Sequence, residues 1–330
     1  MTQPLRWGIT ATGLIAETFV KDLHVAGLSV VAAGSRDLAR AQVFADRLGL
    51  ARAHGSYEAL VSDPEVDVIY VATPHPFHLD GARLALEAGK HVLVEKPFAM
   101  NAAEARQIAA LAEARQLFVM EAMWTRFLPH MCRLREILAS GRLGRLLSLR
   151  ADHGQALPSD PGHRLNDLSL GGGALLDLGI YPVSFACEVL GLPKALHAVA
   201  RFKETGADAA VEVVMRHAGD ALSQLSCASD IRGPNTASVV GEAGSVEIDA
   251  TWYAPARLRL RAPDGAVLEE FEAPMQGRGM QYQALALQEA VQAGQRSHPL
   301  MSIDETIRIL EVMDEIRAQI GLTYPERATG

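Results

Sequence analysis

The segment after the first predicted strand has the glycine pattern of a loop that can hold a phosphate group. It matches G-x-G-x-x-G/A, with alanine in place of the first glycine, through Ala11, Thr12, Gly13, Leu14, Ile15 and Ala16. In such a loop, backbone N–H groups and the N-terminus of the next helix approach a pyrophosphate. A glycine turn between a strand and a helix is also an ordinary connection, so this loop alone leaves both interpretations open.

The end of the second predicted strand indicates which dinucleotide such a loop would hold. An acidic residue there would bind a ribose 2′-hydroxyl, but this sequence has Gly34, Ser35 and Arg36. A carboxylate would repel a 2′-phosphate, whereas arginine and serine can bind one. Arg40, one helical turn later, adds a second positive charge. The alternative is a surface Arg36 paired with Asp37; together with the glycine loop, the pattern favours NADP(H) over NAD(H).

Asp177 and Tyr181 have the spacing of side chains that converge on one ligand, because residues four apart share a helix face. Lys96 directly follows a predicted parallel strand, and open α/β sheets bind ligands at that end of their strands. The structural alternatives are that Asp177 satisfies a glycine-rich helix start, that Tyr181 packs in the core and that Lys96 is a surface residue.

Several other side chains are candidates for ligand contacts. His75 and His78 resemble a metal pair, but with Pro76 between them a cofactor loop or a helix start is the better interpretation, and no metal is predicted. Trp124 follows the sixth predicted strand and can border a nicotinamide, although core packing explains a tryptophan equally well. His153 lies in a strand expected to form the floor of a substrate pocket.

The elements that must position these residues fall into two groups. The first 122 residues alternate short apolar strands with amphipathic helices, which is typical of a doubly wound parallel sheet. The predicted strands are 6–10, 29–34, 68–72, 91–94 and 117–120, and a sixth is possible at 52–54. The predicted helices are 14–26, 38–48, 57–62, 78–88 and 102–114, the last with Asn101 as its N-cap.

Residues 123–330 are assigned to a second, α+β domain with a large, open, mainly antiparallel sheet. Its predicted strands are 146–154, 196–203, 210–217, 221–228, 237–241, 245–248, 258–262 and 267–271, separated by turns that favour antiparallel pairing. Helices are predicted at 127–139, after Gly173 as far as Leu190, at 281–293 and at 303–320.

Composition narrows the functional class. A formal net charge of −8 without a basic stripe argues against nucleic acid as a partner. Three widely spaced cysteines are typical of a reducing compartment. No predicted segment has the roughly 20 uninterrupted apolar residues of a membrane span, and the start of the chain does not resemble a signal peptide. We therefore expect a cytoplasmic protein without a membrane partner.

Several motifs in the same order along the chain resemble the glucose–fructose oxidoreductase/inositol dehydrogenase (Gfo/Idh/MocA) family. They are Ala72–Thr73–Pro74–His75 with His78, Glu95–Lys96–Pro97, and the run from Gly172 to Tyr181. The segments 5–9, 121–127, 235–239 and 279–282 are more narrowly similar to dimeric dihydrodiol dehydrogenases, a subgroup that includes NADP-dependent D-xylose dehydrogenases.

The resemblance implies an N-terminal Rossmann domain, NADP as cofactor and hydride transfer between the nicotinamide and a carbon that bears a hydroxyl. It implies Tyr181 as the acid/base, Lys96 as its ammonium partner and hydroxyl donor, and Asp177 as the residue that orients substrate and lysine. Substrate contacts would come from Lys96, Trp124, His153, Asp177 and Tyr181. Cofactor contacts would come from Ala11, Thr12, Gly13, Leu14, Ile15, Ser35, Arg36, Arg40, Thr73, Pro74, His75, His78, Glu95, Lys96, Trp124, Arg126 and Tyr282.

The family also implies a cis bond before Pro97 and a homodimer formed through the open sheet. Two positions depart from the common pattern: Ala11 replaces a glycine, and Tyr181 stands where many members have histidine. The predicted substrate is a small polyol or sugar, either a trans-dihydrodiol or an aldose. Reduction of a sugar ketone or dicarbonyl is the alternative reaction. The alternative to an enzyme is a non-catalytic regulator that senses a nucleotide.

Overall fold

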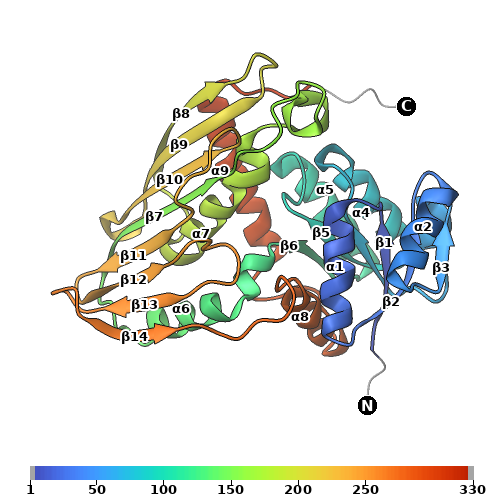
Figure 1. Cartoon of the computed structure of the whole chain (residues 1–330), viewed down its shortest axis with the longest axis horizontal. Helices are drawn as coiled ribbons and strands as arrows, with labels where there is room; N and C mark the ends of the chain where they lie inside the picture. Colours follow the sequence, from blue (N-terminus) through green and yellow to red (C-terminus); the bar gives the residue numbers. More distant parts are fainter. Residues whose placement is uncertain (1–3, 326–330) are drawn as a thin grey trace. The chain divides into compact units, whose positions relative to one another are not determined.

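The structure is a computed structural model that describes residues 4–325 and divides into two compact units (Figure 1). The first unit extends to Phe127 and includes Met275–Ile307. The second consists of Leu128–Pro274 and the segment from Arg308 onward. The boundary therefore falls inside the last helix, and each unit is described separately below.

The first unit is built on a six-stranded parallel sheet with strand order β3-β2-β1-β4-β5-β6. Its strands are β1 (Arg6–Thr10), β2 (Ser29–Gly34), β3 (Arg52–His54), β4 (Val68–Val71), β5 (His91–Glu95) and β6 (Val119–Ala122). Its helices are α1 (Leu14–Val25), α2 (Leu38–Leu48), α3 (Tyr57–Val61), α4 (His78–Glu87), α5 (Ala102–Arg115) and α8 (Gln281–Gln292). The predicted doubly wound sheet is confirmed, and this strand order places ligands at the carboxyl ends of the strands.

Side-chain caps explain where two of these helices begin. Asn101 accepts a hydrogen bond from the backbone N–H of Glu104 at 2.9 Å, and the Glu104 carboxylate accepts one from the N–H of Met100 at 3.0 Å. Asp37 caps α2 by accepting from the N–H of Ala39 at 2.8 Å. Both caps satisfy N–H groups that have no partner inside the helix. The predicted N-cap at Asn101 is confirmed.

The segment Met275–Ile307 differs from the sequence-based division, which placed it in the second domain. Its contacts with the first unit are specific: Asp22 on α1 accepts from the backbone N–H of Met280 at 2.8 Å, and Glu121 on β6 accepts from the Thr306 hydroxyl at 3.2 Å. These partners are separated by well over a hundred residues, so local sequence patterns carry no sign of the pairing. The predicted boundary at residue 122 also moves, because the short helix at Trp124–Phe127 stays with the first unit.

The second unit is built on an eight-stranded sheet of order β14-β13-β12-β11-β7-β10-β9-β8. Its strands are β7 (Leu146–Gly154), β8 (Ala195–Phe202), β9 (Asp208–Arg216), β10 (Leu222–Ala228), β11 (Ala237–Gly241), β12 (Gly244–Ile248), β13 (Leu258–Arg261) and β14 (Val267–Phe271). Only β10 and β7 pair in parallel, and the other neighbours are antiparallel. The prediction of a mainly antiparallel sheet is confirmed.

One face of this sheet is covered by helices and the other is not. The helices α6 (Pro129–Ala139), α7 (Ile180–Leu190) and α9 (Ile303–Ile320) lie on one side of it, and no helix of the described residues covers the opposite face (Figure 1). Residues along the strands alternate accordingly, as in β9, where Val211, Val213 and Met215 are buried and Glu212 and Val214 are exposed. We call the uncovered side the outer face.

Short helical turns complete the fold. They are η1 (His75–Phe77), η2 (Trp124–Phe127), η3 (Arg164–Asn166), η4 (Leu168–Leu170), the π-helix η5 (Leu175–Gly179) and η6 (Ala218–Asp220). The segment Leu168–Leu190 has the length and hydropathy of a membrane span, but 78% of its most apolar stretch is buried inside the structure. Its helical parts η5 and α7 belong to the core of the second unit.

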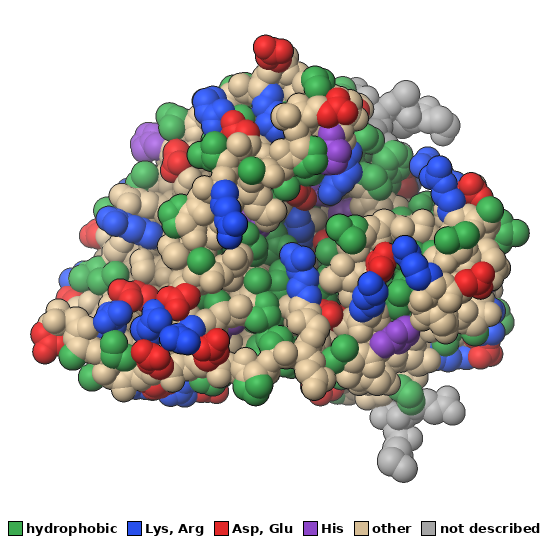
Figure 2. Space-filling view, in the orientation of Figure 1, with side chains coloured by type: hydrophobic (Ala, Val, Ile, Leu, Met, Phe, Trp, Pro, Cys, Tyr) green, Lys and Arg blue, Asp and Glu red, His purple; other side chains and the backbone are tan. Residues whose placement is uncertain are grey.

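The surface carries charges of both signs. Arg side chains alternate with Asp and Glu over the strands β12 to β14 in the space-filling view (Figure 2). Ion pairs account for this pattern, for example Arg261 with Glu247 at 2.7 Å and Arg259 with Asp249 at 2.6 Å.

Candidate active site

The start of α1 has the features of a phosphate-binding turn. Ala11 has a positive φ of 69°, the conformation that the replaced glycine adopts freely, and its N–H donates to the Gly34 carbonyl at 3.0 Å. No side chain caps the helix at Gly13, and a Cβ placed there would meet nothing within 4 Å. The first N–H groups of α1 therefore face open space, where they can bind an anion.

Two arginines follow β2, and only one of them forms an ion pair with a carboxylate. Arg40 lies 3.7 Å from Asp37, whose other oxygen caps α2. Arg36 is exposed, and no ion pair joins it to a carboxylate within residues 4–325. The alternative of an Arg36–Asp37 pair is therefore not what this structure contains. Ser35 is buried, with its hydroxyl 3.3 Å from the N–H of Asp37.

The loop after β4 offers a second polar position at the same edge of the sheet. Thr73 is 9% exposed, and its hydroxyl has no hydrogen-bond partner among the described residues. A buried polar group without a partner is costly unless a ligand or water satisfies it. The open helix start and the Thr73 hydroxyl both fit a dinucleotide along the carboxyl ends of these strands. The neighbouring Pro74 is partly buried and His75 is buried.

His78 begins α4, directly after this loop, and has no surface for a ligand. Its side chain is fully buried, and its ring nitrogens lie 2.8 Å from the carbonyl oxygens of Thr73 and Pro97. Burial is the main reason that its pKa is lowered to about 3, so the ring is neutral and donates one of these bonds at a time. The geometry gives His78 the role of joining two loops, in place of the cofactor contact that the sequence predicted.

Lys96 is presented by a loop that buried carboxylates hold in place. The Lys96–Pro97 peptide bond is cis, as the resemblance implied. Glu95 is buried and is bonded to the Tyr70 hydroxyl and to the Lys96 N–H, so its carboxylate helps to hold the loop. Glu121 accepts from the Phe98 N–H at 3.0 Å, which holds the other side of the loop. Lys96 itself is partly exposed.

Two residues that follow β6, Trp124 and Arg126, are both buried. Arg126 is 2% exposed and is paired with Glu305 at 2.8 Å and with the Leu300 carbonyl at 2.9 Å, so it anchors the returning segment instead of facing a cofactor. Trp124 is 1% exposed, and the Arg278 guanidinium lies 5.1 Å above its ring. Tyr282, on α8 in the same unit, is partly buried.

In the second unit, Asp208 organises the glycine-rich helix start. It is fully buried, and its carboxylate accepts from the Leu175 N–H at 2.6 Å. A Cβ on Gly173, whose φ is 132°, would lie only 1.9 Å from the Asp208 Oδ1. Burial raises the pKa of Asp208 to about 6, against the effect of these N–H bonds. The capping role that was the structural alternative for Asp177 thus belongs to Asp208.

Asp177 and Tyr181 come from the helical segment that Asp208 caps. Asp177 lies in the π-helix Leu175–Gly179 and is partly exposed, and Tyr181 follows in the first turn of α7. Such π turns inside helices are frequent at functional sites. Tyr181 is 6% exposed, which leaves only a small part of its side chain accessible.

Tyr181 belongs to an aromatic cluster on β7 and the loop after β12. Its ring centroid is 5.0 Å from that of His153 and 5.5 Å from that of Tyr253, and the His153 and Tyr253 rings stack at 3.6 Å. Gln155 lies 2.8 Å from the His153 Nε2 and 3.4 Å from the Tyr253 hydroxyl. The predicted proximity of His153 and Tyr181 is therefore present within this unit.

Sequence reasoning missed several members of these clusters. Tyr253, Gln155 and Asp208 carry no motif, and their roles arise from strand pairing between distant segments. Asn235 gave more warning, because it begins the segment 235–239 that is similar to dihydrodiol dehydrogenases. Its φ of 56° and its bonds to both backbone groups of Gly154 lock the loop beside His153. Within residues 4–325, no group of three His, Cys, Asp or Glu is placed to hold a metal ion.

The chain is an oxidoreductase with a dinucleotide-binding domain. A model described as "Oxidoreductase family, NAD-binding Rossmann fold" matches residues 5–123, and one described as "GFO/IDH/MocA C-terminal domain" matches residues 131–247. The chain therefore belongs to the Gfo/Idh/MocA family and has a nicotinamide cofactor. Both the predicted family and the predicted enzyme class are confirmed.

Full-length relatives support a narrower placement. The trans-1,2-dihydrobenzene-1,2-diol dehydrogenase of Homo sapiens is 39% identical, with 98% of each chain covered, and that of Danio rerio is 36% identical with the same coverage. Among solved structures, a 3-ketoreductase from Actinomadura kijaniata in complex with NADP and TDP-benzene is 26% identical, with a TM-score of 0.85 and 96% and 98% of the chains covered. An aldose-aldose oxidoreductase from Caulobacter crescentus complexed with glycerol is 25% identical, with a TM-score of 0.87 and 96% and 97% covered.

Proposed function

We propose that this protein transfers hydride between NADP and a hydroxyl-bearing carbon of a trans-dihydrodiol or of an aldose such as D-xylose. The observation that carries the proposal is full-length similarity to trans-dihydrodiol dehydrogenases at 39% identity. The test incubates the protein with NADP+ and each of D-xylose, D-glucose and a trans-cyclohexanediol. Formation of NADPH is measured by the absorbance of the reduced nicotinamide. Turnover of none of these, by a preparation that binds NADPH, would contradict the proposal.

The preference for NADP over NAD rests on Arg36. This guanidinium is exposed at the end of β2, without a carboxylate partner in residues 4–325, and the sequence has no acidic residue at the 2′-hydroxyl position. We expect Arg36→Ala to weaken NADPH binding by at least tenfold and NADH binding by less than twofold, since only NADPH carries the 2′-phosphate (about 1.4 kcal/mol per tenfold). Arg83→Ala on α4 removes the same charge elsewhere and is the control. An equal loss for both dinucleotides would remove the argument.

We propose that Tyr181 is the acid/base, that Lys96 is its ammonium partner and that Asp177 orients the substrate and the lysine. A base must take the hydroxyl proton as hydride leaves the same carbon, and a free tyrosine, with a pKa of about 10, needs a neighbouring cation to do so at neutral pH. Two observations support this assignment. Asp208 caps the helix start, so Asp177 is not required there, and Tyr181 contacts His153 at the floor of the same cluster.

Reduction of a sugar ketone is a second candidate, favoured by the similarity to a 3-ketoreductase solved with NADP. The same residues would then protonate the oxygen that receives hydride at its carbon. The two reactions differ in the substrate that is consumed. Oxidation of NADPH with a ketone, together with no reduction of NADP+ by diols or aldoses, would favour the reductase.

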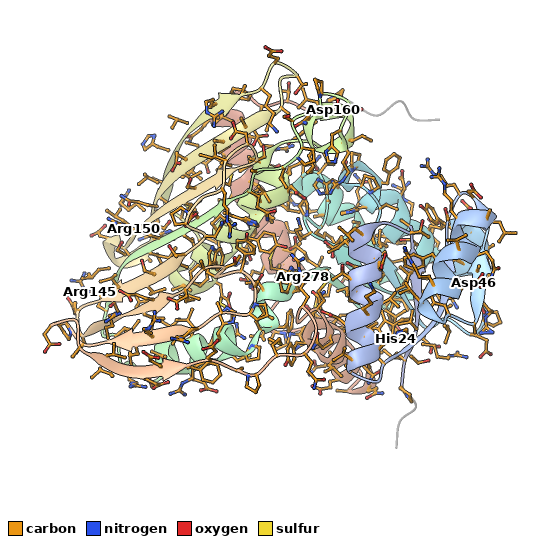
Figure 3. The ribbon with its side chains drawn as sticks, in the orientation of Figure 1. His24, Asp46, Arg145, Arg150, Asp160 and Arg278 are labelled. Carbon is orange, nitrogen blue, oxygen red and sulfur yellow. The ribbon has the colours of Figure 1, made fainter. Side chains whose placement is uncertain are left out.

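We also propose that the outer face of the eight-stranded sheet forms a homodimer. It exposes Val199, Val214, Leu222 and Val240 among polar residues, and Arg150 lies on it near a groove of about 510 Å³ (Figure 3). Exposed apolar side chains gathered on an uncovered sheet face are typical of a protein interface. Val214→Lys should convert a dimer to a monomer in light scattering, whereas Val43→Lys on α2 should not. A monomeric wild type would contradict the proposal.

A further inference from the structure

We propose that Arg278 is an anion-binding residue of the first unit, which receives a phosphate or carboxylate group of the bound cofactor or substrate. The inference deepens the proposed function, because it requires a dinucleotide or substrate at the carboxyl ends of β1 and β6. Neither the family pattern nor the sequence motifs pointed to this residue. Three observations carry it: a clamped loop, a stacked guanidinium and the lack of a carboxylate partner.

The loop that bears Arg278 is held by a single buried carboxylate. Asp22, on α1, is 3% exposed and accepts from the Arg278 N–H at 2.9 Å and from the Met280 N–H at 2.8 Å. Gly277 has a φ of 71°, and a Cβ there would lie 2.3 Å from the Asp22 Oδ1. The carboxylate and the glycine are thus fitted to each other, and together they fix the backbone from which the Arg278 side chain leaves.

The side chain is positioned as well as the backbone. The guanidinium carbon lies 5.1 Å above the ring of Trp124, within the range of a cation–π contact. Trp124 is 1% exposed and directly follows β6, so it is a rigid support. A cation–π contact uses the face of the guanidinium, so the N–H groups in the plane of the fork can still donate to an anion. Figure 3 shows Arg278 beside α1.

The charge of Arg278 is not used within the structure. Arg278 is exposed, and none of the ion pairs formed by residues 4–325 includes it. By contrast, Arg126, two residues after Trp124, is buried and paired with Glu305. A stacked guanidinium with a free edge suits two oxygens of one phosphate or carboxylate, which bind it with two parallel hydrogen bonds.

The position limits the source of that anion to two. The carboxyl end of β6 is the part of such a sheet where the nicotinamide half of a dinucleotide lies, and α1 receives the pyrophosphate. The backbone of Arg278 is tied to Asp22, in the last turn of α1 and away from the N-terminus of that helix, and its side chain lies over Trp124 of η2. The contact with Trp124 therefore favours an acidic group of a substrate that approaches the nicotinamide, and the cofactor's pyrophosphate is the other source that the experiment distinguishes. Neutral polyols offer no such group.

The experiment measures binding of NADPH and NADH by fluorescence titration, and the KM values of a neutral aldose and of the matching uronic acid. It compares the wild type with Arg278→Ala, Arg278→Lys and the control Arg83→Ala, which removes an exposed arginine on α4. Pyrophosphate and ADP-ribose serve as competitors. Equal melting temperatures across the set confirm that the variants are folded.

If the anion is the pyrophosphate, Arg278→Ala weakens NADPH and NADH alike, by about tenfold, and lowers the affinity for ADP-ribose, while Arg278→Lys retains part of it. If the anion is on the substrate, dinucleotide binding is unchanged and only the KM of the uronic acid rises. Unchanged binding of every ligand in Arg278→Ala overturns the inference. Failure of the wild type to bind NADPH overturns the proposed function instead, so the two failures are distinct.

Discussion

The carboxyl group of Glu121 should make the stability of the first unit depend on pH. It is 1% exposed, accepts from the Phe98 N–H at 3.0 Å and receives the Thr306 hydroxyl at 3.2 Å. Burial raises its pKa from 4.5 to about 7, and this effect exceeds the opposing effects of the Phe98 N–H, Arg126 and Thr306. We predict that Glu121→Gln, which has nearly the same shape, stabilises the protein at alkaline pH.

The sign follows from proton binding. The pKa of Glu121 is higher in the folded than in the unfolded protein, so the folded protein holds the proton more tightly. The stabilisation that this proton gives to the folded state is complete below about pH 4.5 and is lost as the pH rises through about 7. The difference of about 2.5 pH units, at about 1.36 kcal/mol per unit, gives about 3 kcal/mol in total. Most of this loss falls between about pH 5 and about pH 8.

The assay is urea unfolding of wild type and Glu121→Gln at these two pH values. We expect the free energy of unfolding of the variant, relative to wild type, to increase by about 2 to 3 kcal/mol from the lower to the higher pH. Glu289→Gln, at an exposed position of α8 in the same unit, should show no such change. A difference between Glu121→Gln and wild type that is the same at both pH values would refute the reasoning.

Three further predictions concern the positions that hold the site. Asp208→Ala leaves the Leu175 N–H buried without an acceptor and should lower the free energy of unfolding by about 1 to 3 kcal/mol, while Asp208→Asn retains an oxygen and should lose less; equal losses in urea unfolding would count against the cap. Asn101→Ala should cost about 1 kcal/mol in the same assay and Asn101→Asp almost nothing, and an equal cost for both would contradict the role of the N-cap. Tyr253→Leu removes the ring stacked on His153 and should reduce kcat roughly tenfold, or about 1.4 kcal/mol, with the Kd of NADPH unchanged; a parallel loss of NADPH affinity would exclude a role confined to the substrate side.

The sequence was most informative where local rules decide the structure. Five of the six parallel strands of the first unit were predicted to within one residue at each end, most of them as short apolar runs between turn residues, and the last was predicted two residues too early. The helices α2 and α5 begin directly after the residues that cap them. The antiparallel strands of the second unit followed from alternation and turn residues. The replacement of a glycine by Ala11 was noted from the loop pattern, and the structure shows that Ala11 adopts a positive φ of 69° there.

Prediction failed where a residue's role depends on a distant partner. Local patterns do not reveal that the backbone of Met280 bonds to Asp22, so the return of Met275–Ile307 to the first unit was not foreseen. His78 and Arg126 were interpreted as cofactor ligands because of their places in motifs, but burial gives both structural partners. Asp208 was missed for the same reason, since it caps a helix that begins 33 residues earlier.

The most direct test of the proposed mechanism compares turnover and cofactor binding in one preparation each of wild type and Tyr181→Phe. Tyr181→Phe preserves the contacts of the ring with His153 and Tyr253 and removes only the hydroxyl. We predict NADP+ reduction by the wild type with a trans-diol or an aldose, a loss of at least about 100-fold in kcat for the variant, and a Kd for NADPH within about twofold of wild type. Turnover by Tyr181→Phe at the wild-type rate would contradict the assignment of the acid/base.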